Sequence, residues 1–284
     1  MGRVVKSLSI TQRDGDRPRL TISPTTADGG LEEWRARLVV GADGPRSIVA
    51  RTAGVTRSPR VLRKAGITYH EATERNAAGQ TAGQTDGASP SDGEFLLGSG
   101  WYVGVAPVPG GRVNVGIVVP ASYLADGLEQ VVKRTRGSMV SGHPRVADEI
   151  VAALPLRHRV SAAAGSGFLL VGDAAGFVDP LTGEGLHRAL VSSELAAEAI
   201  HRWSRGAPDA LRVYDRRLRS RFRNKDVVSW ILQMFLAQPA LLDYAVRRLA
   251  SRNRERNVLT RVLTDQLPAA RAIEPSFLLR LLAP

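Results

Sequence analysis

The 284-residue chain contains no cysteine, and this absence excludes disulfides, thiolate metal sites and cysteine nucleophiles. Its five histidines are scattered without the spacing of metal ligands, so we predict no metal site. No apolar N-terminal segment resembles a signal peptide. The most apolar stretch, Val227 to Leu236, is much shorter than the ~20 residues that a membrane-spanning helix needs. We therefore expect a cytoplasmic globular protein.

Charge of one sign dominates, because the formal net charge is +12 and the pI is near 11.0. Most of the excess lies between His201 and Arg261, in helical patterns whose arginines avoid an apolar stripe. The stripe residues are Leu211, Tyr214, Leu218 and Phe222, and the arginines on other faces are Arg212, Arg216, Arg219 and Arg223. No zinc-finger pattern or aromatic RNA-binding motif accompanies them, so we predict a solvated basic face and no nucleic-acid partner.

The basic region leaves two interpretations open. It adjoins the apolar stretch from Val227 to Leu236, and the tail ends in the apolar run Phe277 to Leu282. Basic residues beside apolar helical faces can dock on anionic lipid surfaces, which predicts peripheral contact with a membrane. The alternative is a helical tail packed on the body of the protein.

The most informative segment runs from Phe168 to Leu186. Its first four residues are apolar and predict a strand covered on both faces, as in parallel α/β sheets. Asp173 then lies just beyond the carboxyl end of that strand, where a carboxylate can accept a hydrogen bond from a ribose or ribityl hydroxyl. Gly183 and Gly185 let the main chain approach a flat ring closely. The segment is typical of a flavin site.

A helix should follow this segment. Pro180 stops any earlier helix, so we expect the start near Glu184, with its free N–H groups and positive dipole end facing the ligand. Small and apolar positions recur at three- and four-residue spacing and predict the face that packs on the sheet. They are Leu186, Ala189, Leu190, Ala196, Ala197 and Ile200.

Two motifs carry a family resemblance. The run from Leu169 to Leu190 resembles the second flavin-binding motif of the geranylgeranyl reductase family, a branch of the flavin hydroxylase superfamily whose members carry GDAAGxxxPLTGEGI. Upstream, Leu38 to Arg51 is similar to the superfamily's GADGxxSxVR motif. Read from its residues alone, this second stretch is an apolar strand, a tight turn and a short helix that Ser47 or Asp43 could cap.

The resemblance implies a set of cofactor residues. It places Asp43 and Gly44 beside the flavin pyrophosphate and, in some relatives, beside the nicotinamide cofactor. Together with the residues of the second motif, the predicted FAD-binding positions are Asp43, Gly44, Gly172, Asp173, Ala174, Pro180, Gly183, Gly185 and Leu186.

The family's first unit, a strand, a GxGxxG turn and a helix, has no counterpart in this sequence. The nearest candidate, Gly98 to Gly104, is spaced one residue too long and leads into a strand-like run. The chain opens instead on a predicted hairpin, with strands at Val4 to Ile10 and Arg19 to Ile22. It resembles the C-terminal two thirds of a flavoenzyme. A start codon assigned too far downstream, a truncated gene or a separate polypeptide that supplies the first unit would each explain this.

Between the two motifs the pattern changes to short strands and predicts an antiparallel sheet. The expected strands are Ile67 to His70, Phe95 to Leu97, Trp101 to Ala106 and Val113 to Val119, with helices near Leu124 to Thr135 and Arg145 to Leu154. The resemblance implies that this sheet covers the flavin as a substrate domain, lined by Trp101, Tyr102 and Pro107. Aromatic residues on a strand are equally typical of plain core.

These patterns predict an α/β chain that is α+β overall. We expect a doubly wound FAD/NAD(P)-binding domain, incomplete at its N-terminus, at residues 1–55 and 161–205. The antiparallel-sheet substrate domain takes residues 56–160, and a helical C-terminal region takes residues 206–284.

The resemblance implies an FAD-dependent oxidoreductase that delivers hydride to a prenyl or other lipid double bond, with NAD(P)H or ferredoxin as electron donor. Thr182 to Leu186 replaces the GGQGxN run of aromatic hydroxylases, which favours the reductase branch. An FAD-dependent monooxygenase of a small aromatic or polyketide substrate and a non-catalytic fragment that does not bind FAD alone remain alternatives. No catalytic residue is identified. His187 departs from the family's aromatic residues; proton donation, diphosphate binding and a plain solvent-facing position stay open.

Overall fold

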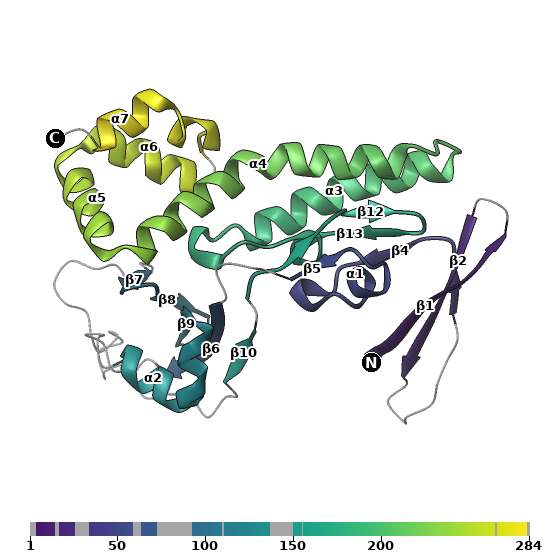
Figure 1. Cartoon of the computed structure of the whole chain (residues 1–284), viewed down its shortest axis with the longest axis horizontal. Coiled ribbons are helices and arrows are strands. Elements are labelled where there is room, and N and C mark those ends of the chain that lie inside the picture. Colours follow the sequence, from purple (N-terminus) through teal and green to yellow (C-terminus); the bar gives the residue numbers. More distant parts are fainter. Residues whose placement is uncertain are drawn as a thin grey trace. The chain divides into compact units, whose positions relative to one another are not determined.

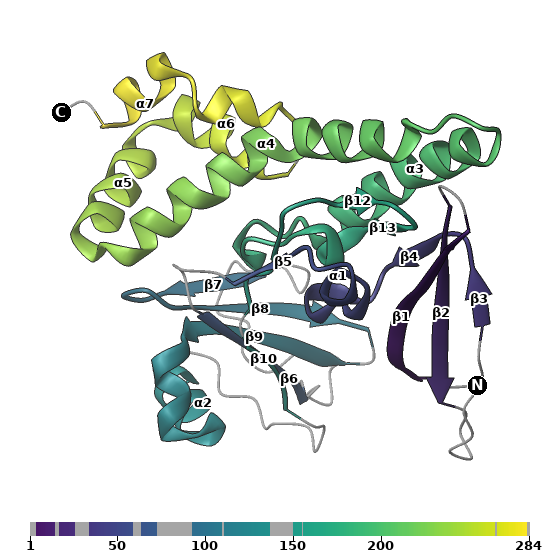
Figure 2. The same ribbon diagram turned by 45° about the vertical axis from the view of Figure 1, so that its right-hand side comes forward.

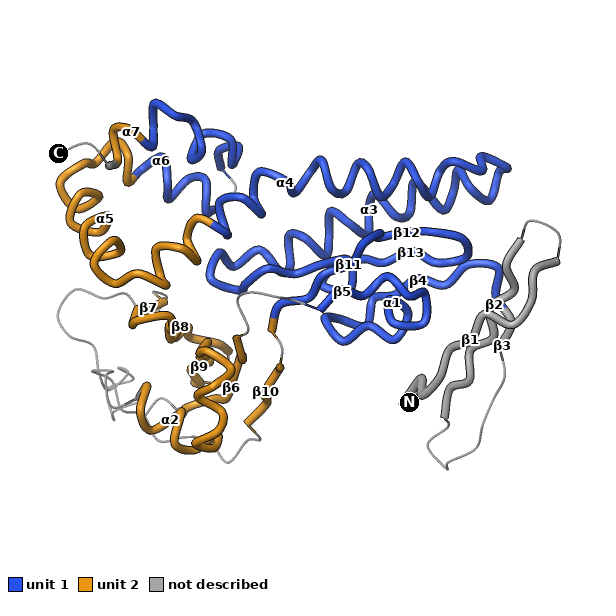
Figure 3. Tube along the Cα trace, in the orientation of Figure 1, with its two compact units in different colours: residues 1–59, 157–230, 257–278 blue, residues 60–156, 231–256, 279–284 orange. Residues whose placement is uncertain are grey.

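The computed structural model describes residues 4–14, 17–25, 34–58, 64–72, 93–109, 111–136, 150–154, 156–264 and 266–282. They divide into two compact units (Figure 3). The first unit comprises residues 1–59, 157–230 and 257–278, and the second comprises residues 60–156, 231–256 and 279–284. Within the expected C-terminal region at 206–284, residues 206–230 and 257–278 fall in the first unit, and residues 231–256 and 279–284 fall in the second.

A three-stranded sheet forms the centre of the first unit, in the order β12 (Ala164–Gly165), β13 (Phe168–Leu170) and β4 (Val39–Gly41). β13 runs parallel to β4 and antiparallel to β12. All three residues of β13 are buried. Leu169 and Val171 pack in one apolar cluster, whereas Phe168 and Leu170 pack in another. The strand is thus covered on both faces, which confirms the prediction from its apolar run.

Helices supply both covers (Figure 1). α1 (Ile48–Thr52) contributes Val49 and Ala50 to the cluster on one face. On the other face lie α3 (Gly185–Ser204) and α4 (Ala210–Ala237), side by side. The Tyr214 hydroxyl of α4 donates a hydrogen bond of 2.5 Å to the Leu170 carbonyl, and burial raises the pKa of Tyr214. The predicted apolar stripe of α4 is buried, and Arg212, Arg216, Arg219 and Arg223 are exposed, as expected.

β4 lies at the edge of this sheet. The Val39 amide donates to the Gly167 carbonyl and the Gly41 carbonyl accepts from Val171, both at 2.9 Å, so both residues face β13. Because alternate residues of a strand bond to opposite sides, the amide and carbonyl of Val40 point to the other edge. No strand within the described ranges pairs there.

A hairpin with a third strand beside it, and a separate pair of two-residue strands, make up the other described β-structure of the first unit. β1 (Val4–Asp14) pairs antiparallel with β2 (Arg17–Thr25), which confirms the predicted hairpin, and β2 pairs with β3 (Trp34–Ala36). β5 (Thr56–Arg57) follows α1 and pairs with β11 (Arg159–Val160).

The second unit is built on an antiparallel sheet, as predicted, with five strands in place of the four expected (Figure 2). Its order is β10 (Val151–Ala153), β6 (Lys64–Ala72), β9 (Arg112–Pro120), β8 (Tyr102–Val108) and β7 (Glu94–Leu97). α2 (Leu128–Arg136) packs Val131 and Val132 into the core of the sheet and is preceded by the 3₁₀ helix η2 (Ala121–Asp126).

One expected helix is wrong. Residues 145–149 lie outside the described residues, but Val151 to Ala153 form a strand instead of the end of a helix. They pair with Gly66 to Thr68 at the edge of β6. A pairing partner more than eighty residues away decides the conformation, and a local pattern does not contain that information.

Three further helices follow α4: α5 (Pro239–Ser251), α6 (Asn253–Leu263) and α7 (Pro275–Leu282), with the 3₁₀ helix η5 (Ala269–Ala272) between the last two. In the part of the chain that the structure describes, no helix combines the length and apolar character needed to cross a bilayer.

Candidate flavin site

The candidate site is built on two strand-to-helix turns, which we call the two corners. The first corner follows β13. The chain enters the 3₁₀ helix η3 (Gly172–Ala175), then η4 (Pro180–Thr182), and begins α3 at Gly185 with Glu184 as N-cap residue. The predicted helix start near Glu184 is thereby confirmed. The Gly172 amide donates to the Ser192 hydroxyl at 2.8 Å, and that hydroxyl is fully buried. Ser192 therefore fastens the turn to the second turn of α3.

Asp173 lies on this turn with its carboxylate uncommitted. It makes no hydrogen bond or ion pair with any residue in the described ranges, and it is half-buried. Burial raises the pKa of Asp173, while the charges of Arg188 and His158 act in the opposite direction. A partly desolvated carboxylate that lacks a protein partner is suited to accept a hydroxyl hydrogen bond from a ligand.

Two glycines of the segment Thr182 to Leu186, whose sequence is TGEGL, show how closely a ligand can approach the main chain. Gly183 has φ = 67°, which an L side chain rarely adopts, so the backbone itself requires glycine there. Gly185 has an ordinary φ, and a Cβ added to it would meet nothing within 4 Å. Neither strain nor packing in the protein requires glycine at 185. A ligand lying against this backbone would supply the reason, and the residues therefore fit a flat cofactor.

The amino end of α3 is open toward the same side. The first intrahelical bond is donated by Arg188 to the Glu184 carbonyl, so the amides of Gly185, Leu186 and His187 have no acceptor in the described structure. The Glu184 side chain does not cap them. Its carboxylate instead forms a buried ion pair with Lys225 of α4 at 3.5 Å, and Lys225 also donates to the Val262 carbonyl at 3.1 Å. Unsatisfied amides at a helix start stabilise negative charge on a ligand.

The second corner follows β4. Ser47 caps α1 by accepting from the Ala50 amide at 2.9 Å. The Asp43 carboxylate accepts from the Ile48 amide at 2.6 Å and the Val49 amide at 3.4 Å. Gly44 has φ = 74° and begins the 3₁₀ helix η1 (Gly44–Arg46). Both residues expected as caps therefore act as caps.

His158 connects the two corners electrostatically. Its Nε2–H donates to the Ala174 carbonyl at 3.1 Å, and its backbone bridges to Phe177. Burial lowers the pKa of His158, opposed by the Ala174 hydrogen bond and by the charges of Asp43 and Asp173. Both carboxylates therefore act on one buried, neutral imidazole, and the sequence offered no local signal for it.

The predicted packing face of α3 needs a correction. Leu186 is 82% exposed and Leu190 is 72% exposed, and Ala197 is exposed as well. The buried positions are Ser192, Ala196 and Ala199. The packed face is rotated away from the leucines because close contact with the sheet and α4 requires small side chains. Leu186 contributes its backbone amide to the site, while its side chain projects outward.

The residues predicted to line a substrate pocket divide between the two units. In the second unit, Tyr102 is buried in the core with Lys64 over its ring at 5.7 Å, Trp101 is half-buried and Pro107 is exposed. In the first unit, His187 packs edge-on against Phe222 at 6.1 Å, and its Nε2 is buried without a hydrogen-bond partner in the described structure. His187 is thus a packed side chain and not a solvent-facing one.

Comparison with known proteins identifies the fold of this site. The model of a family described as "FAD binding domain" matches residues 5–224. The chain belongs to this FAD-binding family. The matched residues include β4, η3, the whole of α3 and about the first half of α4.

Two curated relatives of this FAD-binding chain are named as reductases. A digeranylgeranylglycerophospholipid reductase of Methanopyrus kandleri is 34% identical over 199 residues, which are 66% of this chain and 48% of the relative. A menaquinone reductase of Mycobacterium tuberculosis is 29% identical over 262 residues, or 88% of this chain and 61% of the relative. The chain thus spans about half to three fifths of the length of these curated relatives.

A solved structure shows the same fold. A geranylgeranyl bacteriochlorophyll reductase-like protein of Thermoplasma acidophilum superposes with a TM-score of 0.65 at 21% identity. The match covers 85% of this chain and 60% of that protein.

Proposed function

We propose that the chain forms part of an FAD-dependent reductase that saturates a carbon–carbon double bond of a prenyl lipid. The observation that carries the proposal is the TGEGL segment, with open space in front of Gly185 and three free amides at the start of α3. Relatives named for reduction of a geranylgeranyl lipid and of menaquinone support an isoprenoid substrate.

In this proposal each residue of the two corners has a defined task. FAD supplies the redox chemistry of hydride transfer when bound. Asp173 accepts a hydrogen bond from a ribityl or ribose hydroxyl, and the amides of Gly185 and Leu186 stabilise negative charge at the edge of the ring. The Glu184–Lys225 pair and Ser192 hold these groups in place. NAD(P)H or ferredoxin is the proposed electron donor.

The two units receive proposed roles from the same argument. The first unit, which contains both corners, is the FAD-binding part, and the five-stranded sheet of the second unit is the substrate part. The proposed substrate-contacting residues are Tyr102 and Pro107 of β8 and Trp101, which immediately precedes that strand. For membrane contact, we propose that the exposed arginines of α4 meet anionic lipid headgroups.

Flavin binding is tested by absorbance. The chain alone, and the chain joined to an N-terminal strand–GxGxxG–helix unit, would be purified with FAD and scanned from roughly 350 to 500 nm, where bound oxidised flavin absorbs. We expect colour in the joined form. Absence of flavin from both forms would overturn the proposal.

The reaction is tested on the form that holds flavin. Incubation with geranylgeranyl lipid and reductant without oxygen should add two hydrogen atoms for each double bond saturated. Oxygen-dependent addition of one oxygen atom to an aromatic substrate would instead establish the monooxygenase alternative.

A further inference from the structure

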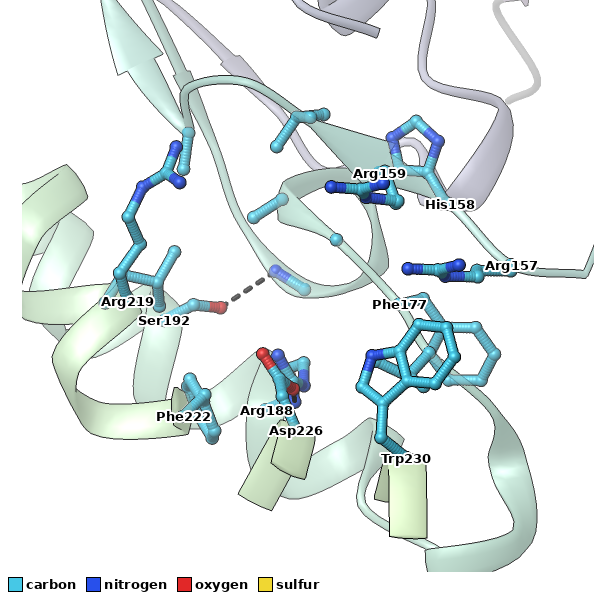
Figure 4. A pocket seen from close by; sticks show the side chains of 17 residues that line it. Arg157, His158, Arg159, Phe177, Arg188, Ser192, Arg219, Phe222, Asp226 and Trp230 are labelled. Atoms are coloured by element: carbon cyan, nitrogen blue, oxygen red, sulfur yellow. Dashed lines mark hydrogen bonds and ion pairs between the residues drawn. The ribbon is translucent and has the colours of Figure 1, made fainter. Parts of the chain in front are cut away.

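A separate cavity of about 280 Å³ lies in the first unit, between the η3 turn, the strand β11, α3 and α4 (Figure 4). Of the predicted flavin-binding residues, Gly172 alone contributes to its wall. Drug-sized ligands occupy pockets of roughly 300–1,000 Å³, so this cavity is too small for a whole dinucleotide. It is suited to a smaller group.

The wall of the cavity carries an excess of positive charge. Four arginines line it, and the carboxylate among the lining residues is Asp226. Asp226 pairs with Arg188 at 2.5 Å. Arg219 pairs with Asp215 at 3.0 Å and donates to the Ser161 carbonyl. The other two arginines are Arg157, just before β11, and Arg159, the first residue of β11.

Arg157 and Arg159 point into the same space (Figure 4). Burial lowers the pKa of Arg157, and the charge of Arg159 lowers it further, although Asp226 opposes both. Arg159 has no ion pair with any residue that the structure describes. Arg159 therefore adds a positive charge to the cavity with which no carboxylate in the described structure pairs, and an anion entering the cavity would offset it.

Aromatic rings complete the wall. The Arg157 guanidinium lies over the Trp230 ring at 4.4 Å, and that of Arg188 lies over Phe222 at 4.4 Å. Stacked in this way, the guanidinium groups are held in fixed planes, which favours bidentate bonding to phosphate oxygens.

We propose that this cavity binds the phosphate or diphosphate group of a phosphate ester, at a position distinct from the flavin. Arg159, which has no ion pair in the described structure, supplies the positive charge that no described carboxylate pairs with. Arg219 lines the cavity while paired with Asp215, and Arg157 and Arg188 are held on their aromatic rings. In the described structure Arg159 and Arg219 make no ion pair or hydrogen bond with a predicted FAD-binding residue, so the anion is bound whether or not the proposed flavin function holds. Arg188 also pairs with Glu184 of the β13 corner at 4.0 Å.

The test measures binding of inorganic pyrophosphate to flavin-free protein by calorimetry. Arg159→Gln and Arg219→Gln should each weaken binding roughly tenfold, the loss of one charge-assisted hydrogen bond. Arg216→Gln is the matched control, since it removes the same charge from the same helix as Arg219 at an exposed position outside the cavity. It should change the dissociation constant by less than about twofold.

Arg159→Gln keeps the test valid if Arg219→Gln unfolds, because Arg159 is exposed and has no ion pair to lose in the described structure. Absence of pyrophosphate binding at millimolar concentration would overturn the proposal. Equal weakening by Arg216→Gln would also overturn it, since binding would then reflect general charge attraction.

Two esters identify the source of the group. Geranylgeranyl diphosphate binding more tightly than pyrophosphate would assign the site to a lipid ester, whereas ADP binding more tightly would assign it to a nucleotide. Both results support the anion site. Competition of FAD with pyrophosphate for one site, with the same loss in Arg159→Gln, would overturn its separation from the flavin.

Discussion

The two corners of the candidate site share a plan but are stabilised differently. After β4, the Asp43 carboxylate is consumed by amides five and six residues away. After β13, the Asp173 carboxylate has no partner in the described structure, and contacts from α3 and α4 hold the turn instead. In the β4 corner, local hydrogen bonds therefore occupy the carboxylate of Asp43. In the β13 corner, side chains from α3 and α4 stabilise the turn, so the carboxylate of Asp173 remains available to a ligand.

The largest effect on stability is expected from breaking the contacts that α3 and α4 make with the β13 corner. Glu184→Ala removes the buried ion pair with Lys225 and the longer pair with Arg188, and it should lower the free energy of unfolding by about 3 kcal/mol, measured by urea denaturation. Glu198→Ala is the control, because its pair with Arg217 is exposed and should contribute less than about 1 kcal/mol. The double change Glu184→Leu, Lys225→Met should recover most of the loss. If Glu184→Ala and Glu198→Ala lowered the free energy of unfolding equally, the stability of the β13 corner would not depend on the Glu184–Lys225 pair.

The corner after β4, which local hydrogen bonds stabilise, should show an intermediate change in the free energy of unfolding. Asp43→Ala removes a helix-capping acceptor and should cost about 1 kcal/mol in the same urea experiment. Asp173→Asn should not lower stability, because burial already disfavours its charged form. In a flavin-containing preparation, however, Asp173→Asn should weaken FAD binding roughly tenfold. A stability loss in Asp173→Asn equal to that of Asp43→Ala would remove the contrast between the corners.

His158 gives a pH-dependent test of the region where the corners meet. Its pKa is lowered by burial, so its contribution to stability is fully present above the ordinary pKa of 6.5 and is lost as pH falls through the folded-state value. His158→Gln keeps an N–H for the Ala174 carbonyl but does not titrate. The wild type should lose stability relative to this variant below pH 6.5, with a slope of at most about 1.4 kcal/mol per pH unit. Parallel curves would show that the imidazole is not selectively neutral in the fold.

Gly185→Ala should have the smallest effect on stability. A Cβ there meets no protein atom, and alanine is the better helix former, so the urea midpoint should stay constant or rise slightly. FAD binding should nevertheless weaken. Unchanged FAD affinity would mean that no ligand lies against this backbone. Gly41→Ala is the contrasting variant, because its Cβ would lie 2.7 Å from the Leu170 side chain and should destabilise the sheet by about 1–3 kcal/mol.

Sequence reasoning succeeded where the determining contacts are local. The caps at Asp43 and Ser47, the start of α3 near Glu184 and the apolar stripe of α4 each depend on residues within a few turns. It failed where distant partners decide. The strand at Val151 to Ala153 exists through pairing with β6, and the exposure of Leu186 and Leu190 depends on which neighbours α3 meets. The arginine cavity was not predicted, because β11, α3 and α4 bring its walls together only in the fold.

The contact between Arg157 and Trp230 has a practical consequence for spectroscopy. The indole of Trp230 forms part of the cavity wall, 4.4 Å from a cation. An anion that draws the guanidinium away would change the emission of this tryptophan. Trp203, which lies beneath Arg37 in the same unit, is outside the cavity and should keep its emission. The protein therefore carries an intrinsic optical reporter, together with an internal reference, for whatever enters this cavity.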